Sequence, residues 1–214
     1  MRLVLPRLYV ILDAALVTVP ELELAQELAA AGVRLLQYRN KSAPPRQLLE
    51  SSRRLASTLL PQGFTFFVND RSDVAFLAGA SGVHVGQEDL DVEQARSVVG
   101  PDMYVGVSTH NLEQFRLAAN SSADYIAVGP IFATSSKANP DPVVGTALLR
   151  EVRSLTDKPI VAIGGITLER AAEVVEAGAD SVAVISDILR APDPGGRAHQ
   201  YIELLGAAPP AARG

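Results

Sequence analysis

Polar side chains follow an apolar stretch at residues 65–70, which reads TFFVND. Thr65 to Val68 have the aromatic and β-branched side chains that are typical of a buried strand. Asn69 and Asp70 come directly after it, although an amide and a carboxylate are costly to bury without partners. This contrast indicates that the two side chains serve a site at the end of the strand.

The same arrangement recurs after the other apolar stretches of the chain. Amides, charged groups, hydroxyls or paired glycines follow each of them. In chain order these candidates are Gln37, Arg39, Lys41, Asn69, Asp70, Gln87, Glu88, Asp89, Ser108, Thr109, His110, Thr134, Ser135, Ser136, Lys137, Gly164, Gly165, Ser186 and Asp187. If the strands form a closed parallel barrel, these groups gather at the mouth where its strands end.

Gln37, Arg39 and Lys41 occupy alternate positions, so they share one face of a strand that stays regular this far. Two cations and an amide on one face suit an anionic ligand. The alternative is that Arg39 and Lys41 are solvated charges of a loop. The polar groups at the other strand ends favour the anion site.

Asp70 and Asp89 follow consecutive strands, which allows their carboxylates to converge. Magnesium typically takes one or two protein carboxylates and completes its shell with substrate oxygens and water. The cations nearby make a magnesium ion that bridges to a phosphate group the natural hypothesis. The alternative is that Asp70 and Asp89 cap the helices that follow them.

Gly164 and Gly165 allow backbone N–H groups to approach a ligand closely. A helix that starts after the last strand adds further donors, and the loops after the last two strands of such barrels usually bind phosphate. The longest loop on this side, residues 129–145, is expected to close over the substrate as a lid. The alternative is a mobile surface loop without such a role.

None of the three histidines is singled out by the sequence as a catalytic base. His84 lies within a short strand and is read as a packed core residue, His110 lies near the start of a helix, and His199 lies on the last helix. No pair has the spacing of metal ligands, and no Ser–His–Asp arrangement is evident. A site rich in charge-stabilising groups and poor in bases favours departure of a leaving group over proton abstraction.

The elements that position these groups alternate regularly between strand and helix. The expected strands are 8–13, 33–39, 65–70, 82–86, 104–109, 124–132, 159–165 and 181–186. The expected helices are 20–32, 44–60, 72–80, 91–100, 111–121, 146–155, 167–178 and one C-terminal helix that ends at 206. Eight such units predict an α/β fold, a single-domain (β/α)8 TIM barrel over residues 1–206, with a frayed tail at 207–214. The alternative is an open doubly wound sheet, which usually has fewer strands and often a glycine-rich first turn that this chain lacks.

Composition excludes several classes of function. The chain has 214 residues, 48% of them hydrophobic and 20% charged, with a net charge of −5 and no cysteine. Disulfides, thiol catalysis and thiolate metal sites are therefore excluded, and no basic stripe marks a surface for nucleic acid. The N-terminal apolar run contains Pro6, Arg7 and Asp13 and is read as a strand rather than a signal peptide. No membrane span is expected, the expected location is the cytoplasm, and a homo-oligomer is left open.

A series of motifs in this chain resembles the thiamine phosphate synthase family. The motifs are QYRNK, FVNDRSDVA, GVHVGQEDL, VGVSTHN, DYIAVGPIFATSSK, VAIGGI and AVIS, in the order and spacing of the family and across nearly the whole chain. The resemblance implies a magnesium-dependent transferase. It would join 4-amino-5-hydroxymethyl-2-methylpyrimidine diphosphate to a thiazole phosphate and give thiamine phosphate and pyrophosphate; a carboxylated thiazole would also lose carbon dioxide. The C–O bond would break first, and the thiazole nitrogen would capture the pyrimidinyl-methyl cation.

The resemblance also assigns residues to roles. The pyrimidine diphosphate would contact Gln37, Tyr38, Arg39, Asn40, Lys41, Asn69, Ser108 and Lys137, of which Arg39, Lys41, Ser108 and Lys137 would serve catalysis. The metal ligands would be Asp70 and Asp89. The thiazole phosphate would contact Thr134, Ser135, Ser136, Gly164, Gly165, Ile185 and Ser186.

Two positions depart from the family pattern. The family usually has Glu where this chain has Asn40. By alternation this side chain faces away from Arg39 and Lys41, so the departure is expected to have little effect on the site. The family often has Lys at Ser135, and its loss here is expected to weaken phosphate affinity without abolishing the chemistry.

Three other interpretations remain open at this point. A TenI-like thiazole tautomerase shares fold and phosphate site, but it uses a histidine where this chain has Pro130. A sugar-phosphate isomerase or epimerase would need facing acid–base residues that are not evident beyond the two aspartates. A non-catalytic barrel that binds a phosphate ligand would tolerate a decayed site, whereas the site residues here are intact.

Overall fold

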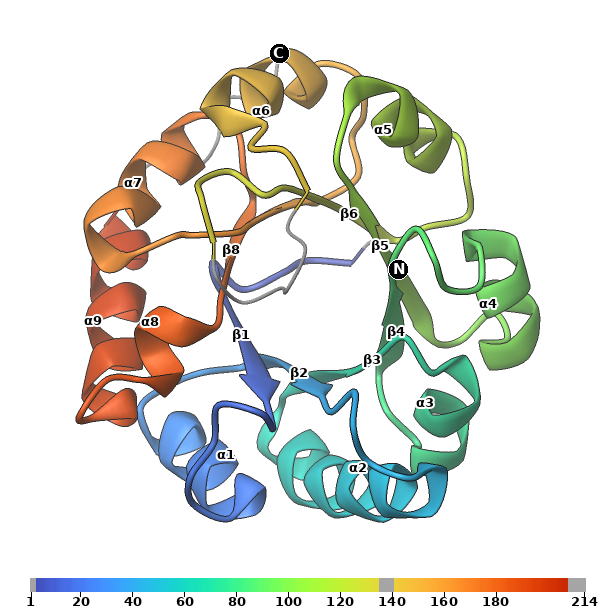
Figure 1. The fold of residues 1–214 in the computed structure, drawn as a ribbon, viewed down its shortest axis with the longest axis vertical. Coiled ribbons are helices and arrows are strands. Elements are labelled where there is room, and N and C mark those ends of the chain that lie inside the picture. The colour runs from blue at the N-terminus through green and yellow to red at the C-terminus, as the bar shows by residue number, and fades with distance from the viewer. Residues whose placement is uncertain (1–2, 135–140, 208–214) are drawn as a thin grey trace.

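Eight parallel strands form a closed barrel in chain order, with β1 paired to both β2 and β8 (Figure 1). The structure is a computed structural model that describes residues 3–134 and 141–207. The strands are β1 (Leu8–Asp13), β2 (Leu35–Arg39), β3 (Thr65–Asn69), β4 (Gly82–Val85), β5 (Tyr104–Thr109), β6 (Tyr125–Val128), β7 (Ile160–Ile163) and β8 (Ser181–Val184). The predicted (β/α)8 TIM barrel is confirmed, and the open sheet is excluded.

Helices surround the barrel and cover the outward faces of its strands (Figure 1). They are α1 (Glu21–Ala30), α2 (Pro45–Leu59), α3 (Ser72–Ala78), α4 (Val92–Val99), α5 (Leu112–Ala119), α6 (Gly145–Arg153), α7 (Leu168–Glu176), α8 (Ser186–Leu189) and α9 (Pro194–Ala207), with a 3₁₀ turn η1 (Leu60–Gln62) after α2. The sequence predicted one helix after the last strand, and the structure has two. Pro192 and Pro194 explain the break, since the residue before a proline is disfavoured in helical conformation.

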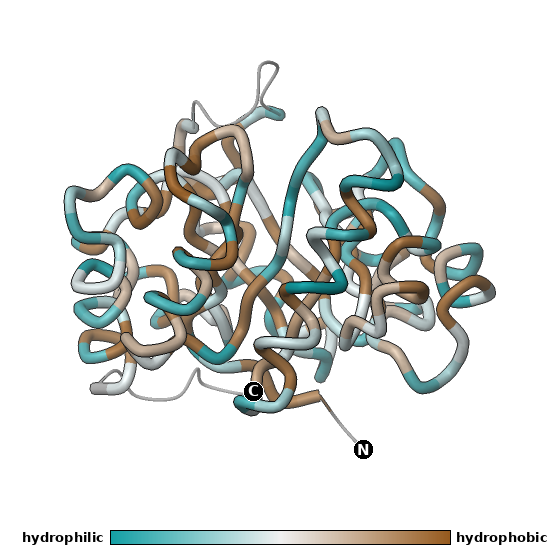
Figure 2. Tube along the Cα trace, turned by 90° about the horizontal axis from the view of Figure 1, so that it is seen from below, coloured by the Kyte–Doolittle hydropathy of each residue, from teal (hydrophilic) through white to brown (hydrophobic). Residues whose placement is uncertain are grey.

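Two apolar layers result from the alternation of side chains along the strands. Outward side chains such as Val10, Leu12 and Leu36 pack against the helices in one large cluster. Inward side chains form a second cluster within the barrel, made of Tyr9, Ile11, Leu35, Phe67, Tyr125, Ala127, Val161 and Ala183 and joined by Leu3 and Leu5. Figure 2 shows the molecule turned by 90°, with hydrophobic and hydrophilic stretches alternating along the chain. This packed interior leaves the carboxyl ends of the strands as the place for chemistry.

The strand register decides which side chains meet at those ends. Asp13 at the end of β1 lies beside Arg39 at the end of β2, and Asn69 at the end of β3 lies beside His84 of β4. Gln37 and Arg39 share the inward direction, whereas Tyr38 between them points outward. The barrel therefore brings residues from separate parts of the chain to one mouth.

Among residues 3–134 and 141–207, no helix is long and apolar enough to cross a membrane. Ala207, which the sequence placed in the tail, is the last residue of α9, and residues 208–214 lie outside the described part.

Candidate active site

An ion pair joins the ends of β1 and β2. The Arg39 guanidinium Nη1 donates a hydrogen bond to Asp13 Oδ2, and the Asp13 side chain is only 4% exposed. Asp13 Oδ1 also accepts a hydrogen bond from the Ala15 backbone N–H at 3.1 Å. Asp13 thus holds Arg39 at the mouth. Sequence reasoning missed Asp13, although it ends the stretch LYVILD just as Asp70 ends TFFVND.

Two carboxylates and a lysine meet just beyond the ends of β2, β3 and β4. Lys41 Nζ lies 3.2 Å from Asp70 Oδ2, and Asp89 Oδ2 accepts a hydrogen bond from the Gly86 N–H at 2.8 Å. Burial raises the pKa of Asp70, the neighbouring Asp89 raises it further, and Lys41 acts in the opposite direction. The sequence prediction that Asp70 and Asp89 converge therefore agrees with the geometry.

The interpretation of these aspartates as helix caps is wrong for both side chains. The N-cap of α4 is Asp91, whose side chain accepts a hydrogen bond from the Gln94 N–H in a capping box. The N-cap of α3 is Arg71, and no side chain caps that helix. Asp70 instead takes a left-handed backbone conformation, with φ of 63°. Asp adopts this conformation more readily than most residues, but it remains uncommon.

The donor set of Asp70 and Asp89 fits a magnesium ion. Both side chains offer hard carboxylate oxygens, and a bound cation would relieve their mutual repulsion. Among the described residues, no group of three or more His, Cys, Asp or Glu side chains could hold a metal ion by itself. Such a two-carboxylate site suits magnesium, which keeps waters and substrate oxygens in its shell.

A continuous chain of hydrogen bonds crosses the barrel interior beneath the mouth. Gln37 Nε2 donates to the Tyr9 hydroxyl at 2.9 Å, and the Tyr9 and Tyr125 hydroxyls lie 3.1 Å apart. The Tyr125 hydroxyl lies 2.7 Å from His84 Nδ1, and His84 Nε2 lies 2.8 Å from Ser108 Oγ. Two residues expected to contact the substrate, Gln37 and Ser108, are thus the ends of one network.

The structure changes the interpretation of His84. It is buried as expected, but both ring nitrogens have hydrogen-bonding partners, so it is more than a space-filling residue. Burial lowers the pKa of His84 to about 4, which keeps the imidazole neutral at physiological pH. Sequence reasoning singled out neither Tyr9 nor Tyr125, whose inward direction follows only from the register of the closed barrel.

Tyr38 and Asn40 lie apart from this network. The Tyr38 hydroxyl donates to Glu21 Oε1 of α1 at 2.6 Å, and Asn40 Nδ2 donates to the Tyr38 hydroxyl at 3.2 Å. Burial raises the pKa of Tyr38 to about 12. Asn40 Oδ1 accepts a hydrogen bond from the Ala43 N–H at 3.0 Å. The structure therefore directs both side chains away from Gln37 and Arg39, as alternation predicted for Asn40.

Paired glycines shape the end of β7. Gly164 and Gly165 have φ angles of 99° and 62°, which favour glycine over other residues. A Cβ on Gly165 would lie 2.3 Å from the Ala133 carbonyl oxygen, and one on Gly164 would lie 2.5 Å from Pro130 Cβ. The Phe132 N–H donates to the Gly164 carbonyl at 3.0 Å. The glycines are needed where the β6–α6 loop packs on the end of β7.

The remaining predicted residues are only partly described. Ile185 directly precedes α8, which begins at Ser186 and has just four residues. Thr134 is half-buried at the last described position before the gap. Ser135, Ser136 and Lys137 lie outside the described residues, so their predicted roles and that of the lid stay predictions.

Comparison with known proteins decides the family. The family model described as thiamine monophosphate synthase matches residues 8–188. The chain belongs to this family. A thiamine-phosphate synthase of Koribacter versatilis is 54% identical over 208 residues, which cover 94% of this chain and 96% of that protein. One of Shouchella clausii is 46% identical, over 80% of this chain and 82% of that protein.

A solved structure supports the same family. The thiamine phosphate pyrophosphorylase from Pyrococcus furiosus has a TM-score of 0.86 and 33% identity, and the match covers 94% of this chain and 96% of that chain. Membership of the thiamine monophosphate synthase family makes this chain an enzyme of thiamine biosynthesis and a transferase.

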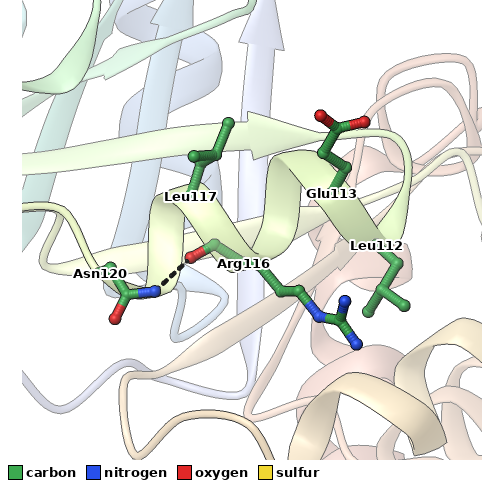
Figure 3. Close-up of a pocket in the computed structure, with 5 residues that line it drawn as sticks. All are labelled: Leu112, Glu113, Arg116, Leu117 and Asn120. Carbon is green, nitrogen blue, oxygen red and sulfur yellow. Dashed lines mark hydrogen bonds between the residues drawn. The ribbon is translucent and has the colours of Figure 1, made fainter.

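A surface hollow on α5 is separate from the family's site. It is lined by Leu112, Glu113, Arg116, Leu117 and Asn120 on the outside of the barrel (Figure 3). Asn120 Nδ2 donates to the Arg116 carbonyl there at 2.9 Å. None of the residues predicted to bind substrate or metal lines this hollow.

Proposed function

We propose that this enzyme catalyses the magnesium-dependent coupling of 4-amino-5-hydroxymethyl-2-methylpyrimidine diphosphate with a thiazole phosphate. The products are thiamine phosphate and pyrophosphate. The observation that carries this proposal is the cluster of Lys41, Asp70 and Asp89 beside Arg39 at the barrel mouth, with 3.2 Å between Lys41 Nζ and Asp70 Oδ2. Cations and paired carboxylates in one place suit a diphosphate together with a hard metal ion.

The diphosphate binds at the β2 side of the mouth in this proposal. Arg39 and Lys41 contact its oxygens, and Lys137 adds a third cation from the β6–α6 loop. Asp70 and Asp89 would hold magnesium, which would supply neutralisation of the charge on the leaving pyrophosphate. Asp13 keeps the Arg39 guanidinium directed at the mouth through their ion pair.

The pyrimidine ring lies over the interior of the barrel. Gln37, Asn69 and Ser108 contact it from β2, β3 and β5, three strands that share the mouth. The side chains of Tyr38 and Asn40 make no contact with the ring in this proposal, because Tyr38 bonds to Glu21 and Asn40 bonds to Tyr38 and to the Ala43 N–H. The thiazole phosphate contacts Thr134, Ser135, Ser136, Gly164, Gly165, Ile185 and Ser186, as the family resemblance implies.

Bond breaking precedes bond making in the proposed reaction. The C–O bond between the pyrimidinyl methylene and the diphosphate breaks, and the electron pair leaves with pyrophosphate. The lone pair of the thiazole nitrogen then forms the new C–N bond, and a carboxylated thiazole afterwards loses carbon dioxide. Arg39 and Lys41 stabilise the charge of the departing group, so no strong base is needed. Holding both substrates in line supplies the remaining acceleration.

Product analysis tests this proposal. Purified protein is incubated with magnesium, the pyrimidine diphosphate and either the plain or the carboxylated thiazole phosphate, and products are identified by mass spectrometry. Thiamine phosphate as the product supports the synthase. Isomerisation of the thiazole without coupling would contradict it and favour the tautomerase, and binding of the thiazole phosphate without any product would favour the non-catalytic barrel.

A further inference from the structure

The hydrogen bonds inside the barrel form what we call the interior chain: Gln37, Tyr9, Tyr125, His84 and Ser108. Its members come from β2, β1, β6, β4 and β5, and its bonds measure 2.9, 3.1, 2.7 and 2.8 Å. Gln37 and His84 are buried, and Tyr9 and Tyr125 are at most 1% exposed. Ser108 is half-buried. Polar side chains inside an apolar barrel are stable only if each donor meets an acceptor.

The donor and acceptor groups fix the direction in which each hydrogen bond of the interior chain is donated. Gln37 Nε2 can only donate, so the Tyr9 oxygen accepts. The hydroxyl proton of Tyr9 then goes to Tyr125, its other partner, and the Tyr125 proton goes to His84 Nδ1. A neutral imidazole carries one proton, which must therefore reside on Nε2 and be donated to Ser108 Oγ.

We propose that the interior chain sets the hydrogen-bonding direction of two residues at the mouth. Ser108 accepts from His84, so its hydroxyl proton is free to be donated to a ligand. Gln37 directs its amide nitrogen to Tyr9, which leaves its carbonyl oxygen to accept from a ligand, beside the second amide N–H. Tyr9, Tyr125 and His84 are thereby positioning residues, which act on the ligand only through Ser108 and Gln37.

The direction selects a type of ligand. The Ser108 hydroxyl proton favours an acceptor on the ligand, and the Gln37 carbonyl oxygen favours a donor. This consequence rests on the proposed function, in which the ligand is an aminopyrimidine with an exocyclic amino donor and with acceptors at its ring nitrogens and diphosphate. An oxo group in place of the amino group would set an acceptor against the Gln37 carbonyl oxygen and lose affinity.

Two glycines make room for the aromatic rings that hold the interior chain of hydrogen bonds in place. A Cβ on Gly106 would lie 2.1 Å from Tyr125 Cζ, and one on Gly82 would lie 2.6 Å from Phe67 Cε1. The Tyr125 ring packs edge-on against Phe67, with ring centroids 5.3 Å apart, and stacks on His84 at 5.5 Å. The absence of side chains at Gly82 and Gly106 therefore lets Tyr125 place its hydroxyl at His84.

Nitrogen NMR of isotope-labelled protein tests the direction without any substrate. The chemical shifts of the two ring nitrogens distinguish the tautomers, and with three histidines in the chain a His84→Gln variant assigns the signals. The expected result at neutral pH is a neutral His84 with the proton on Nε2. A proton on Nδ1, or on both nitrogens, would overturn the proposal. A protein that lacks synthase activity but has the proton on Nε2 would contradict the proposed function and support the interior chain.

A matched pair of variants tests the positioning role. Tyr125→Phe removes the donor to His84. Tyr104→Phe removes a hydroxyl at the start of β5, which is the end of the strand away from Ser108. We expect Tyr125→Phe to lower the population of the Nε2 tautomer and to lower kcat/KM for the pyrimidine diphosphate about tenfold, the usual effect of one hydrogen bond. The KM for the thiazole phosphate should not change.

The Tyr104→Phe control shows which result would contradict the positioning role of Tyr125. Tyr104→Phe should match wild type in both the tautomer and kcat/KM, and a Tyr125→Phe protein that behaves like this control would overturn the proposal. If Tyr125→Phe does not fold, Tyr9→Phe interrupts the same chain one bond earlier, with the same outcomes expected. The wild-type spectrum decides the direction of the chain in either case.

Discussion

Asp70 lies where the charged form of its carboxyl is disfavoured. Burial and the neighbouring Asp89 raise its pKa, and only Lys41 opposes them. Its φ of 63° adds backbone strain. Backbone strain and a perturbed carboxyl together at the end of a barrel strand are typical of a functional residue rather than a structural one. A bound cation would relieve the repulsion between the two carboxylates.

Removal of either carboxylate should therefore impair catalysis. We expect Asp70→Asn and Asp89→Asn each to lower kcat at fixed magnesium about a hundredfold or more, because charge stabilisation by a bound metal is worth several kcal/mol. Steady-state kinetics at several magnesium concentrations measures this effect. Asp73→Asn is the matched control, since Asp73 is exposed on neighbouring α3 and pairs with Arg71. Loss of activity in the control as large as in the two variants would contradict the metal assignment.

The raised pKa of Asp70 also predicts a pH dependence of stability. A carboxyl of this kind keeps its proton in the folded state at pH values where the unfolded chain has lost it. The stability it contributes is complete below 3.8, the ordinary pKa of aspartate, and is lost as the pH rises through the folded value. Without metal, Asp70→Asn should therefore have a higher Tm than wild type at neutral pH.

That advantage should shrink as the pH falls toward 3.8. Thermal denaturation in the presence of a chelator, over a series of pH values, measures it. Asparagine is well suited to this comparison because it also tolerates a positive φ. A variant that is less stable than wild type by the same margin at every pH would show that Asp70 imposes no such cost.

Single residues were predictable from the sequence only where a rule applied to one strand at a time. Alternation along β2 predicted that Gln37 and Arg39 share a face, and both point inward. The partners of those residues, Tyr9 and Asp13, were missed because they come from β1 and become neighbours only through the register. Pairing across strands depends on barrel closure, which no local pattern states.

At the scale of elements, the end of β7 is the most constrained part of the site. The backbone of Ala133 and Phe132 crosses directly over Gly165. The carbonyl of Ile163 accepts a hydrogen bond from the Ile131 N–H at 2.9 Å. Residues 131–133 of the β6–α6 loop are thus bonded to or packed on the end of β7, so this part of the loop and the strand end act as one unit.

A side chain at Gly165 should disturb this unit. Gly165→Ala would place a Cβ 2.3 Å from a carbonyl oxygen at a φ of 62°, and we expect a loss of about 2–4 kcal/mol in unfolding free energy. The KM for the thiazole phosphate should also rise. Chemical denaturation and steady-state kinetics measure the two effects.

Gly63→Ala is the matched control for this variant. Gly63 has a φ of 79°, but a Cβ there would meet no atom within 4 Å. It should cost only the backbone strain, about 1 kcal/mol, and leave both KM values unchanged. Equal effects of the two substitutions would show that the contact with Ala133 has no importance.

Strands and helices were largely predictable, and the differences have local causes. The strand expected at 124–132 ends at Val128, because Gly129 and Pro130 begin the loop that crosses β7. The strand expected at 159–165 ends at Ile163, because Gly164 and Gly165 leave the extended conformation. Apolar residues continued past both ends, so hydrophobicity alone overestimated the strands.

At the scale of the whole molecule, closure of the barrel explains why the candidate site residues lie at one end. Eight short strands contribute their inward side chains to a filled interior, and the polar residues after them have only the mouth to occupy. The number and order of strand–helix units predicted this closed form, since the pattern repeats along the chain. The interior chain was not predictable, because it joins five strands that only closure brings together.

In the proposed reaction, the residues at the barrel mouth couple the two substrates in the presence of magnesium and release pyrophosphate. The most direct measurement is pyrophosphate released from a mixture of both substrates and magnesium, with each component omitted in turn and with a chelator added. We predict release only in the complete mixture, with one thiamine phosphate formed for each pyrophosphate. No release from the complete mixture, or equal release with the chelator present, would contradict the account.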